Sequence, residues 1–125
     1  MAQYSFERLR PEYERLWAQM AVLKNPVVAA QARKVIASKS RYQEVERRTG
    51  VPWFVVGCLH MRESNGNFNT YLGNGQPLNR VTTIVPKGRG PWKTFEDGAE
   101  DALAIDHLDQ VKTWTVARVA YAMES

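Results

Sequence analysis

Glu63 is the residue of this chain whose type and position best suit acid chemistry. It stands at the C-terminal end of a helix predicted by the short, almost wholly apolar segment 52–61, and a loop of small polar and amide residues follows it. Apolar surroundings and the negative end of the helix dipole both disfavour an ionised carboxylate. Glu63 could therefore donate a proton near neutral pH, as a general acid must. The alternative is an ordinary exposed residue at a helix end.

Helical spacing favours the first interpretation. In a helix, Val56, Leu59, His60 and Glu63 share one side, because residues three, four and seven positions apart lie on the same face. The carboxylate therefore extends the apolar face, and we expect it to be partly buried. His60 could hydrogen-bond near the acid, although a hydrogen-bonded core histidine is the simpler interpretation.

The bulk properties fit one globular domain spanning residues 1–125. A net charge of +4 and a pI near 9.4 favour anionic partners, which could be nucleic acid, anionic lipid or a cell-wall polymer. The basic residues are scattered, so charge alone does not choose among them. No apolar run approaches the roughly 18 residues that span a bilayer, so we expect no membrane insertion. The first residues lack the apolar segment of a signal peptide, which predicts synthesis in the cytoplasm.

The sequence gives little support for metal binding or thiol chemistry. Cys58 is the only cysteine, so no intrachain disulfide can form, and its place in the apolar helix predicts a buried side chain. His107 has no second histidine at metal-ligand spacing. We therefore predict neither a metal site nor a cofactor.

Apolar periodicity predicts further helices at residues 4–24, at 27–48 with an interruption near Ser38, from Thr94 onwards, and after Lys112. The inward-facing side chains expected in the second and last of these are Val28, Ala32, Val35, Ile36, Tyr42 and Val45, and Trp114, Val116, Val119 and Ala120. Residues 64–92 are rich in Gly, Pro and Asn. Within them, residues 80–85 predict a strand and residues 73–75 a turn. The expected fold class is α+β, mainly helical, with a small central β-hairpin or sheet.

These features also carry a family resemblance. Residues 51–64 (VPWFVVGCLHMRES) are similar to the catalytic helix of phage endolysin-type lysozymes, which are related to goose-type lysozymes and soluble lytic transglycosylases. The acid of those relatives is the Glu of a Glu-Ser pair. The resemblance continues through residues 67–78 (NFNTYLGNGQPL), 85–89 and the helix over 92–108, and covers most of residues 41–123. The pair alone is common, but the pair with these later segments is much more specific.

The resemblance implies a lysozyme-like domain that cleaves the β-1,4 bond between N-acetylmuramic acid and N-acetylglucosamine in peptidoglycan. Glu63 would protonate the leaving oxygen, and Ser64 would support it by a hydrogen bond. The sugar cleft would be lined by the Asn-rich loop, with Asn67, Asn69, Tyr71 and Asn74 as substrate-binding residues. A phage or prophage enzyme of this kind would be made in the host cytoplasm and act on the wall after release.

Two departures from the family pattern bear on mechanism. Relatives often carry Asp where this chain has Gln76, which can position a water molecule but cannot accept its proton at neutral pH. This favours a single-acid mechanism, such as a transglycosylase, or a slow hydrolase.

Relatives also continue beyond Ser125 with a Tyr-Asn-Gly segment. We therefore expect a truncated form, or a second chain that completes the cleft. Tyr121 is a candidate substitute for the missing tyrosine, although a core role is the simpler one.

Two other functions stay open at this point. A peptidoglycan-binding module with weak or no turnover would fit Gln76 and the early chain end. A nucleic-acid-binding helical domain would fit the charge, but the scattered basic residues and the lack of a recognition motif argue against it.

Overall fold

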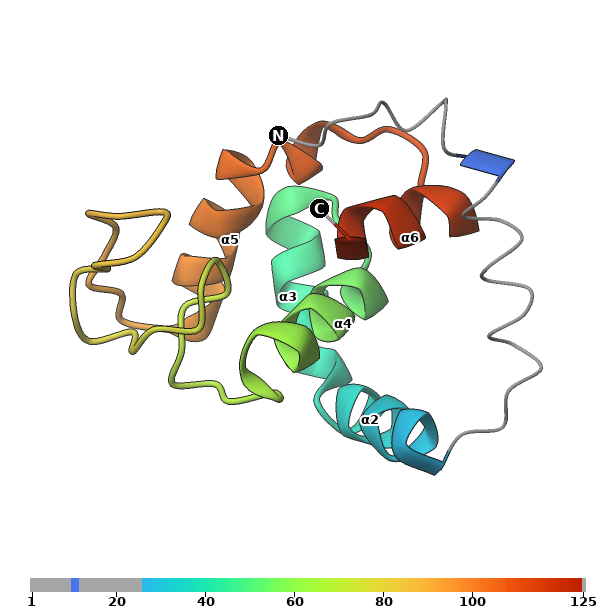
Figure 1. Cartoon of the computed structure of the whole chain (residues 1–125), viewed down its shortest axis with the longest axis horizontal. Helices are drawn as coiled ribbons and strands as arrows, with labels where there is room; N and C mark the ends of the chain where they lie inside the picture. The colour runs from blue at the N-terminus through green and yellow to red at the C-terminus, as the bar shows by residue number, and fades with distance from the viewer. Residues whose placement is uncertain (1–9, 12–25, 125) are drawn as a thin grey trace.

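The computed structural model describes residues 10–11 and 26–124, so the helix expected over 4–24 lies almost wholly outside the described residues. The described helices are α2 (Pro26–Ala37), α3 (Lys39–Thr49), α4 (Trp53–Ser64), α5 (Phe95–Ile105) and α6 (Val116–Glu124), with a 3-10 turn at Leu108–Gln110. Figure 1 shows α3 and α5 side by side, and α4 packs against α3 near the centre of the view. The mainly helical class is therefore confirmed.

Local sequence signals set several helix boundaries as predicted. Ser38 alone separates α2 from α3, and Gly50 ends α3 with a left-handed φ of 78° while its N–H donates to Glu46 O at 2.7 Å. Thr94 caps α5, because its hydroxyl oxygen accepts the Asp97 N–H at 3.1 Å. Pro52 precedes α4 and has no side-chain acceptor, so Glu46 of α3 accepts the Trp53 N–H at 2.8 Å instead.

The core lies where α3 packs against both α4 and α5. Buried side chains from these helices include Tyr42, Val45, Val55, Val56 and Leu103. Gly57 allows the close approach of α4 to its neighbours, because a Cβ atom there would overlap the Val35 side chain and lie 3.1 Å from the Tyr42 ring. The last helix, α6, also contacts α4, and its buried residues include Ala117 and Ala122.

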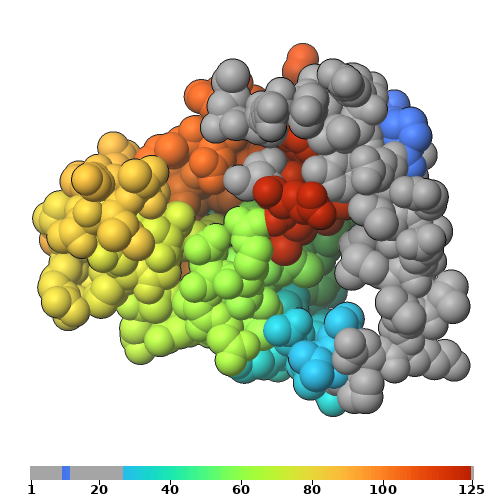
Figure 2. Space-filling view, in the orientation of Figure 1, coloured from blue at the N-terminus to red at the C-terminus, as the bar shows by residue number. Residues whose placement is uncertain are grey.

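The segment between α4 and α5 forms one end of the molecule, drawn in yellow in Figure 2. The strand predicted over residues 80–85 does not form, and the described residues contain only a single antiparallel bridge, between Thr70 and Pro77. A tight turn closes that bridge, with Gly75 N donating to Tyr71 O at 2.8 Å. The turn prediction is thus confirmed, while the hairpin is reduced to one bridge within an irregular loop.

Five residues predicted to be buried are exposed. Cys58 is exposed, because it lies on the side of α4 opposite the apolar face that carries Val55 and His60. Val28, Ala32 and Ile36 of α2 are exposed, and so is Val116 at the start of α6. Periodicity identifies an apolar face but does not reveal which part of it a neighbouring element covers.

The contact at Gly57 generates a stability prediction. Gly57→Ala should lower the free energy of unfolding by about 1–3 kcal/mol, because the added methyl overpacks the space filled by the stiff Val35 side chain. Urea denaturation measures the change. Val35→Ala in the same chain should recover part of the loss, and a fully additive double mutant would contradict direct contact between the two positions.

Candidate functional site

Glu63 occupies the last turn of α4, and its side chain is 27% exposed, which agrees with the partial burial expected from its spacing. The sequence did not reveal its partner: Arg62 Nη2 donates to Glu63 Oε1 at 3.1 Å. The chain then turns sharply at Asn65, which adopts a left-handed φ of 55°. Glu63 is therefore an ion-paired carboxylate at the point where helix gives way to loop.

Ser64 holds the loop that follows Glu63. Its Oγ accepts the Asn67 N–H at 3.2 Å and lies 3.4 Å from Asn67 O and 3.5 Å from His60 O. These contacts are to backbone groups of the turn. They give Ser64 a role in shaping the loop, which differs from the expected hydrogen bond to the acid.

His60 is fully buried and ties this loop to the helical core. Its Nε2 lies 2.8 Å from Asn67 O and its Nδ1 lies 2.8 Å from the Tyr42 hydroxyl. A carbonyl only accepts, so Nε2 carries the proton and Nδ1 accepts the Tyr42 proton. Burial lowers the pKa of His60 and keeps the ring neutral. The interpretation of His60 as a hydrogen-bonded core histidine is confirmed.

Aromatic rings surround His60. Phe68 and Phe95 lie 4.6 Å and 4.3 Å from it between ring centroids, and Tyr42 stacks on Phe68. Arg41 covers Phe68, with its guanidinium carbon 4.1 Å from the ring centroid, and makes a two-bond ion pair with Glu96 of α5. Phe68, two residues before the first bridge residue, is thereby fixed against α3 and α5.

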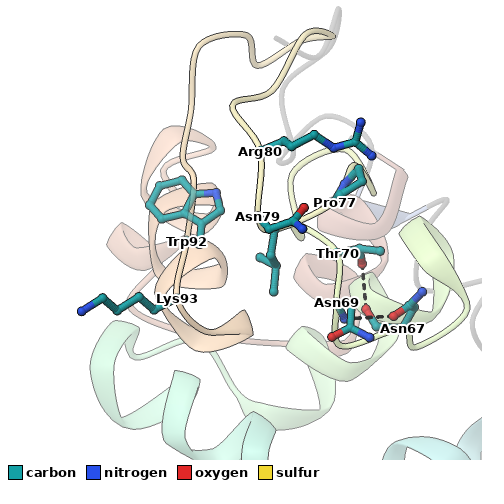
Figure 3. A pocket seen from close by; sticks show the side chains of 9 residues that line it. Asn67, Asn69, Thr70, Pro77, Asn79, Arg80, Trp92 and Lys93 are labelled. Carbon is teal, nitrogen blue, oxygen red and sulfur yellow. Dashed lines mark hydrogen bonds between the residues drawn. The ribbon is translucent and has the colours of Figure 1, made fainter.

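A groove of about 490 Å³ opens beside this anchored loop. Figure 3 shows the side chains that line it, which are Asn67, Asn69, Thr70, Pro77, Leu78, Asn79, Arg80, Trp92 and Lys93. Asn67 and Asn69 were predicted to bind substrate, and both are exposed in the lining. Asn67 Oδ1 accepts the Asn69 N–H at 2.9 Å, which leaves the Asn67 amide nitrogen free to face a ligand. Glu63, Tyr71, Asn74, Gln76 and Tyr121 are not among the lining residues.

Gln76 joins two loops. Its Oε1 accepts the Thr83 N–H at 2.7 Å and the Ile84 N–H at 3.3 Å, while its Nε2 donates to Thr83 Oγ1 at 2.9 Å. Asn74 adds a bond from its Nδ2 to Ile84 O at 3.2 Å. The Gln76 amide, predicted to position water, is thus engaged at both ends by the protein. Both side chains fix the loop over residues 80–91 to the loop over residues 69–78.

Tyr71, predicted to contact substrate, is fully buried and cannot reach a ligand in this structure. Its ring stacks on Trp92 at a centroid distance of 5.5 Å, and its hydroxyl donates to Asp101 Oδ2 at 2.7 Å. Asp101 also accepts two bonds from Arg89. Burial opposes ionisation of Asp101, but the bonds from Arg89 and Tyr71 outweigh it and lower its pKa. Tyr71 therefore supports the groove from beneath.

Tyr121 is half-buried on α6, with the Arg118 guanidinium carbon 5.0 Å from its ring centroid. Apart from Asn67 and Asn69, the groove lining consists of seven residues that the sequence analysis did not assign to a site, which are Thr70, Pro77, Leu78, Asn79, Arg80, Trp92 and Lys93. One signal could have identified this region. Residues 76–93 contain four cationic residues and no Asp or Glu.

The described residues hold no group of three His, Cys, Asp or Glu side chains arranged for a metal ion. Within the same ranges no helix is long and apolar enough to cross a membrane. Comparisons with protein-family models, curated proteins and solved structures find no match. The site must therefore be interpreted from its own chemistry.

Burial of neutral His60 predicts a pH-dependent stability. Because the pKa of His60 in the folded chain lies below its ordinary value of 6.5, protonation favours the unfolded chain. The contribution of neutral His60 to the free energy of unfolding is therefore complete above pH 6.5. It declines as the pH falls from 6.5 towards the lower pKa of His60 in the folded chain. Urea denaturation between about pH 5 and pH 7.5 should show this slope in the wild-type chain and not in His60→Gln. The other histidine, His107, is exposed, so His107→Gln should keep the slope. Loss of the slope in His107→Gln instead would contradict the assignment.

The Gln76 contacts predict a local effect. Gln76→Ala should leave the Thr83 and Ile84 N–H groups without their acceptor, at a cost of about 0.5–1.5 kcal/mol. Amide hydrogen exchange should become faster at these two positions. Lys87→Ala, an exposed change in the same loop, is the matched control and should leave both rates unchanged. Unchanged rates in Gln76→Ala would mean that the two loops are held together by other contacts.

Proposed function

We propose that this chain cleaves the β-1,4 bond between N-acetylmuramic acid and N-acetylglucosamine in peptidoglycan, with Glu63 as the general acid. The observation that carries the proposal is the junction at the end of α4. There a partly buried glutamate leads directly, through Ser64, into the loop whose amides line the groove. The resemblance of the same segments to phage endolysin-type lysozymes supports it further.

The groove chemistry suits a glycan. Asn67, Asn69 and Asn79 offer amide donors and acceptors for hydroxyl and acetamido groups. Trp92 and Leu78 add apolar surface for the faces of sugar rings. Pockets that combine apolar surface with a few fixed polar groups are the usual form of small-ligand sites.

Glu63 lies close to this loop at the level of the backbone. A Cβ atom added to Gly75 would come within 2.8 Å of Glu63 O, so the turn over residues 73–75 packs on the end of α4. The proposal requires that a sugar seated along the loop reach the Glu63 carboxyl. For proton transfer, that carboxyl must exchange its bond to Arg62 for one to the glycosidic oxygen.

A single-acid route fits the residues best. Glu63 would protonate the leaving oxygen as the bond to C1 breaks, and the carboxylate would then accept a proton from the attacking hydroxyl. No carboxylate lines the groove among the described residues, and the Gln76 amide is engaged with Thr83 and Ile84. Attack by the C6 hydroxyl of the muramic sugar would need no second base and would yield a 1,6-anhydro product.

A second candidate function is a peptidoglycan-binding module with little or no turnover. It is favoured by two observations, that Glu63 is ion-paired with Arg62 and that it does not line the groove. In either case we propose a phage or prophage protein that is made in the host cytoplasm and acts on the wall after release.

Glu63→Gln should lower the rate at which the protein clears a suspension of outer-membrane-stripped Gram-negative cells by roughly 100-fold or more. The amide keeps the size of the side chain and removes its acidic proton. Glu100→Gln, at an exposed glutamate of α5, is the matched control and should clear cells like the wild type. Equal clearing by Glu63→Gln and wild type would exclude Glu63 from the chemistry. Pelleting with cell walls without clearing by any variant would select the binding module.

A further inference from the structure

The segment that forms one side of the groove has an unusual charge. Residues 76–93 include Arg80, Lys87, Arg89 and Lys93 and no acidic residue. Arg89 is neutralised by Asp101. The other three are exposed and make no hydrogen bond or ion pair with the part of the chain that the structure describes. Elsewhere, Arg41, Arg47, Arg48 and Arg62 each pair with a carboxylate.

Two of these three unpaired cations line the groove. Figure 3 shows Arg80 and Lys93 extending towards opposite sides of it, with Asn79 between them. Arg80 also borders a smaller hollow of about 130 Å³ next to Gln76 and Thr83. A groove with a cation at each side and no carboxylate in its described lining has a positive potential that attracts an anionic ligand.

The positions of both cations are fixed by the backbone. Trp92 N donates to Leu78 O at 2.8 Å. This hydrogen bond joins the residue before Lys93 to a residue two positions before Arg80. Trp92 is held in turn by its stack on buried Tyr71. Gly90 makes room for this arrangement, because a Cβ atom there would lie 2.8 Å from Trp92 Nε1. The two cations therefore flank one framework and do not belong to independent loops.

We propose that Arg80 and Lys93 make this groove selective for a glycan whose sugars carry carboxylates, over a neutral glycan of the same backbone. The inference rests on the proposed function only in taking the ligand to be a glycan. A strand lying along the groove would place carboxylates on successive substituted sugars near one cation and then the other. The asparagines would bind the neutral groups common to both kinds of glycan, so the two cations alone would supply the discrimination.

The test is a binding measurement by isothermal titration calorimetry with the Glu63→Gln protein, which keeps the groove and prevents turnover. The probes are peptide-free peptidoglycan strands that keep their lactyl carboxylates, the same strands with these groups amidated, chitohexaose, and a single-stranded oligonucleotide. Intact strands should bind roughly three- to tenfold more tightly than amidated strands or chitohexaose, and the difference should shrink as salt is added.

Arg80→Gln/Lys93→Gln, added to the same protein, should lower the affinity for intact strands to that for amidated strands. Lys87→Gln/Lys112→Gln removes the same charge at exposed lysines outside the groove and should leave the affinity unchanged. Thermal melting checks that each variant is folded.

Equal affinity for intact and amidated strands would overturn the inference, and so would an equal loss in both double variants. Oligonucleotide binding as tight as that of the intact strands would assign the cations to nucleic acid instead. These outcomes are distinct from failure of the proposed function, which is decided by whether Glu63→Gln still clears cells.

Discussion

The site depends on one buried hydrogen-bond chain, from the Tyr42 hydroxyl through the His60 ring to the Asn67 carbonyl. It joins α3 and α4 to the loop that follows Glu63. The Thr70 hydroxyl donates to the same carbonyl at 2.7 Å, so a single backbone oxygen organises the start of the groove. Since the ring is buried among Phe68, Phe95 and Tyr42, loss of either partner would leave an unpaired polar group in the core, which is costly.

A second set of contacts holds the far side of the groove, and it substitutes for a sheet. Gln76 and Asn74 fasten residues 83–84, while Arg89 and Tyr71 converge on Asp101 of α5. Side-chain bonds can therefore order an irregular loop that has only one β-bridge. The consequence for mechanism is that the Gln76 side chain serves the architecture, because its amide is engaged at both ends by Thr83 and Ile84. This leaves Glu63 as the one acid to which the proposed chemistry assigns proton transfer.

The sequence predicted what local signals determine. Gly50, Pro52 and Thr94 act on their own neighbours, so the ends of α3, α4 and α5 could be predicted without tertiary information. The strand over residues 80–85 could not. Its β-branched residues favour extended backbone. In the structure, however, the backbone and hydroxyl of Thr82 form hydrogen bonds with Arg89 and Pro86 of the same loop, and no second strand among the described residues pairs with this segment. Tyr71 shows the same limit, because its role depends on Asp101, which lies 30 residues further along the chain.

In the proposed mechanism, Glu63 cleaves glycan strands without a second carboxylate. Mass spectrometry of the soluble products from purified peptidoglycan sacculi tests it most directly, because the product ends record the route. The single-acid route predicts muropeptides with 1,6-anhydro ends from the wild-type protein and none from Glu63→Gln. Products with ordinary reducing ends would contradict the single-acid route, and identical products from both proteins would contradict the role of Glu63 itself.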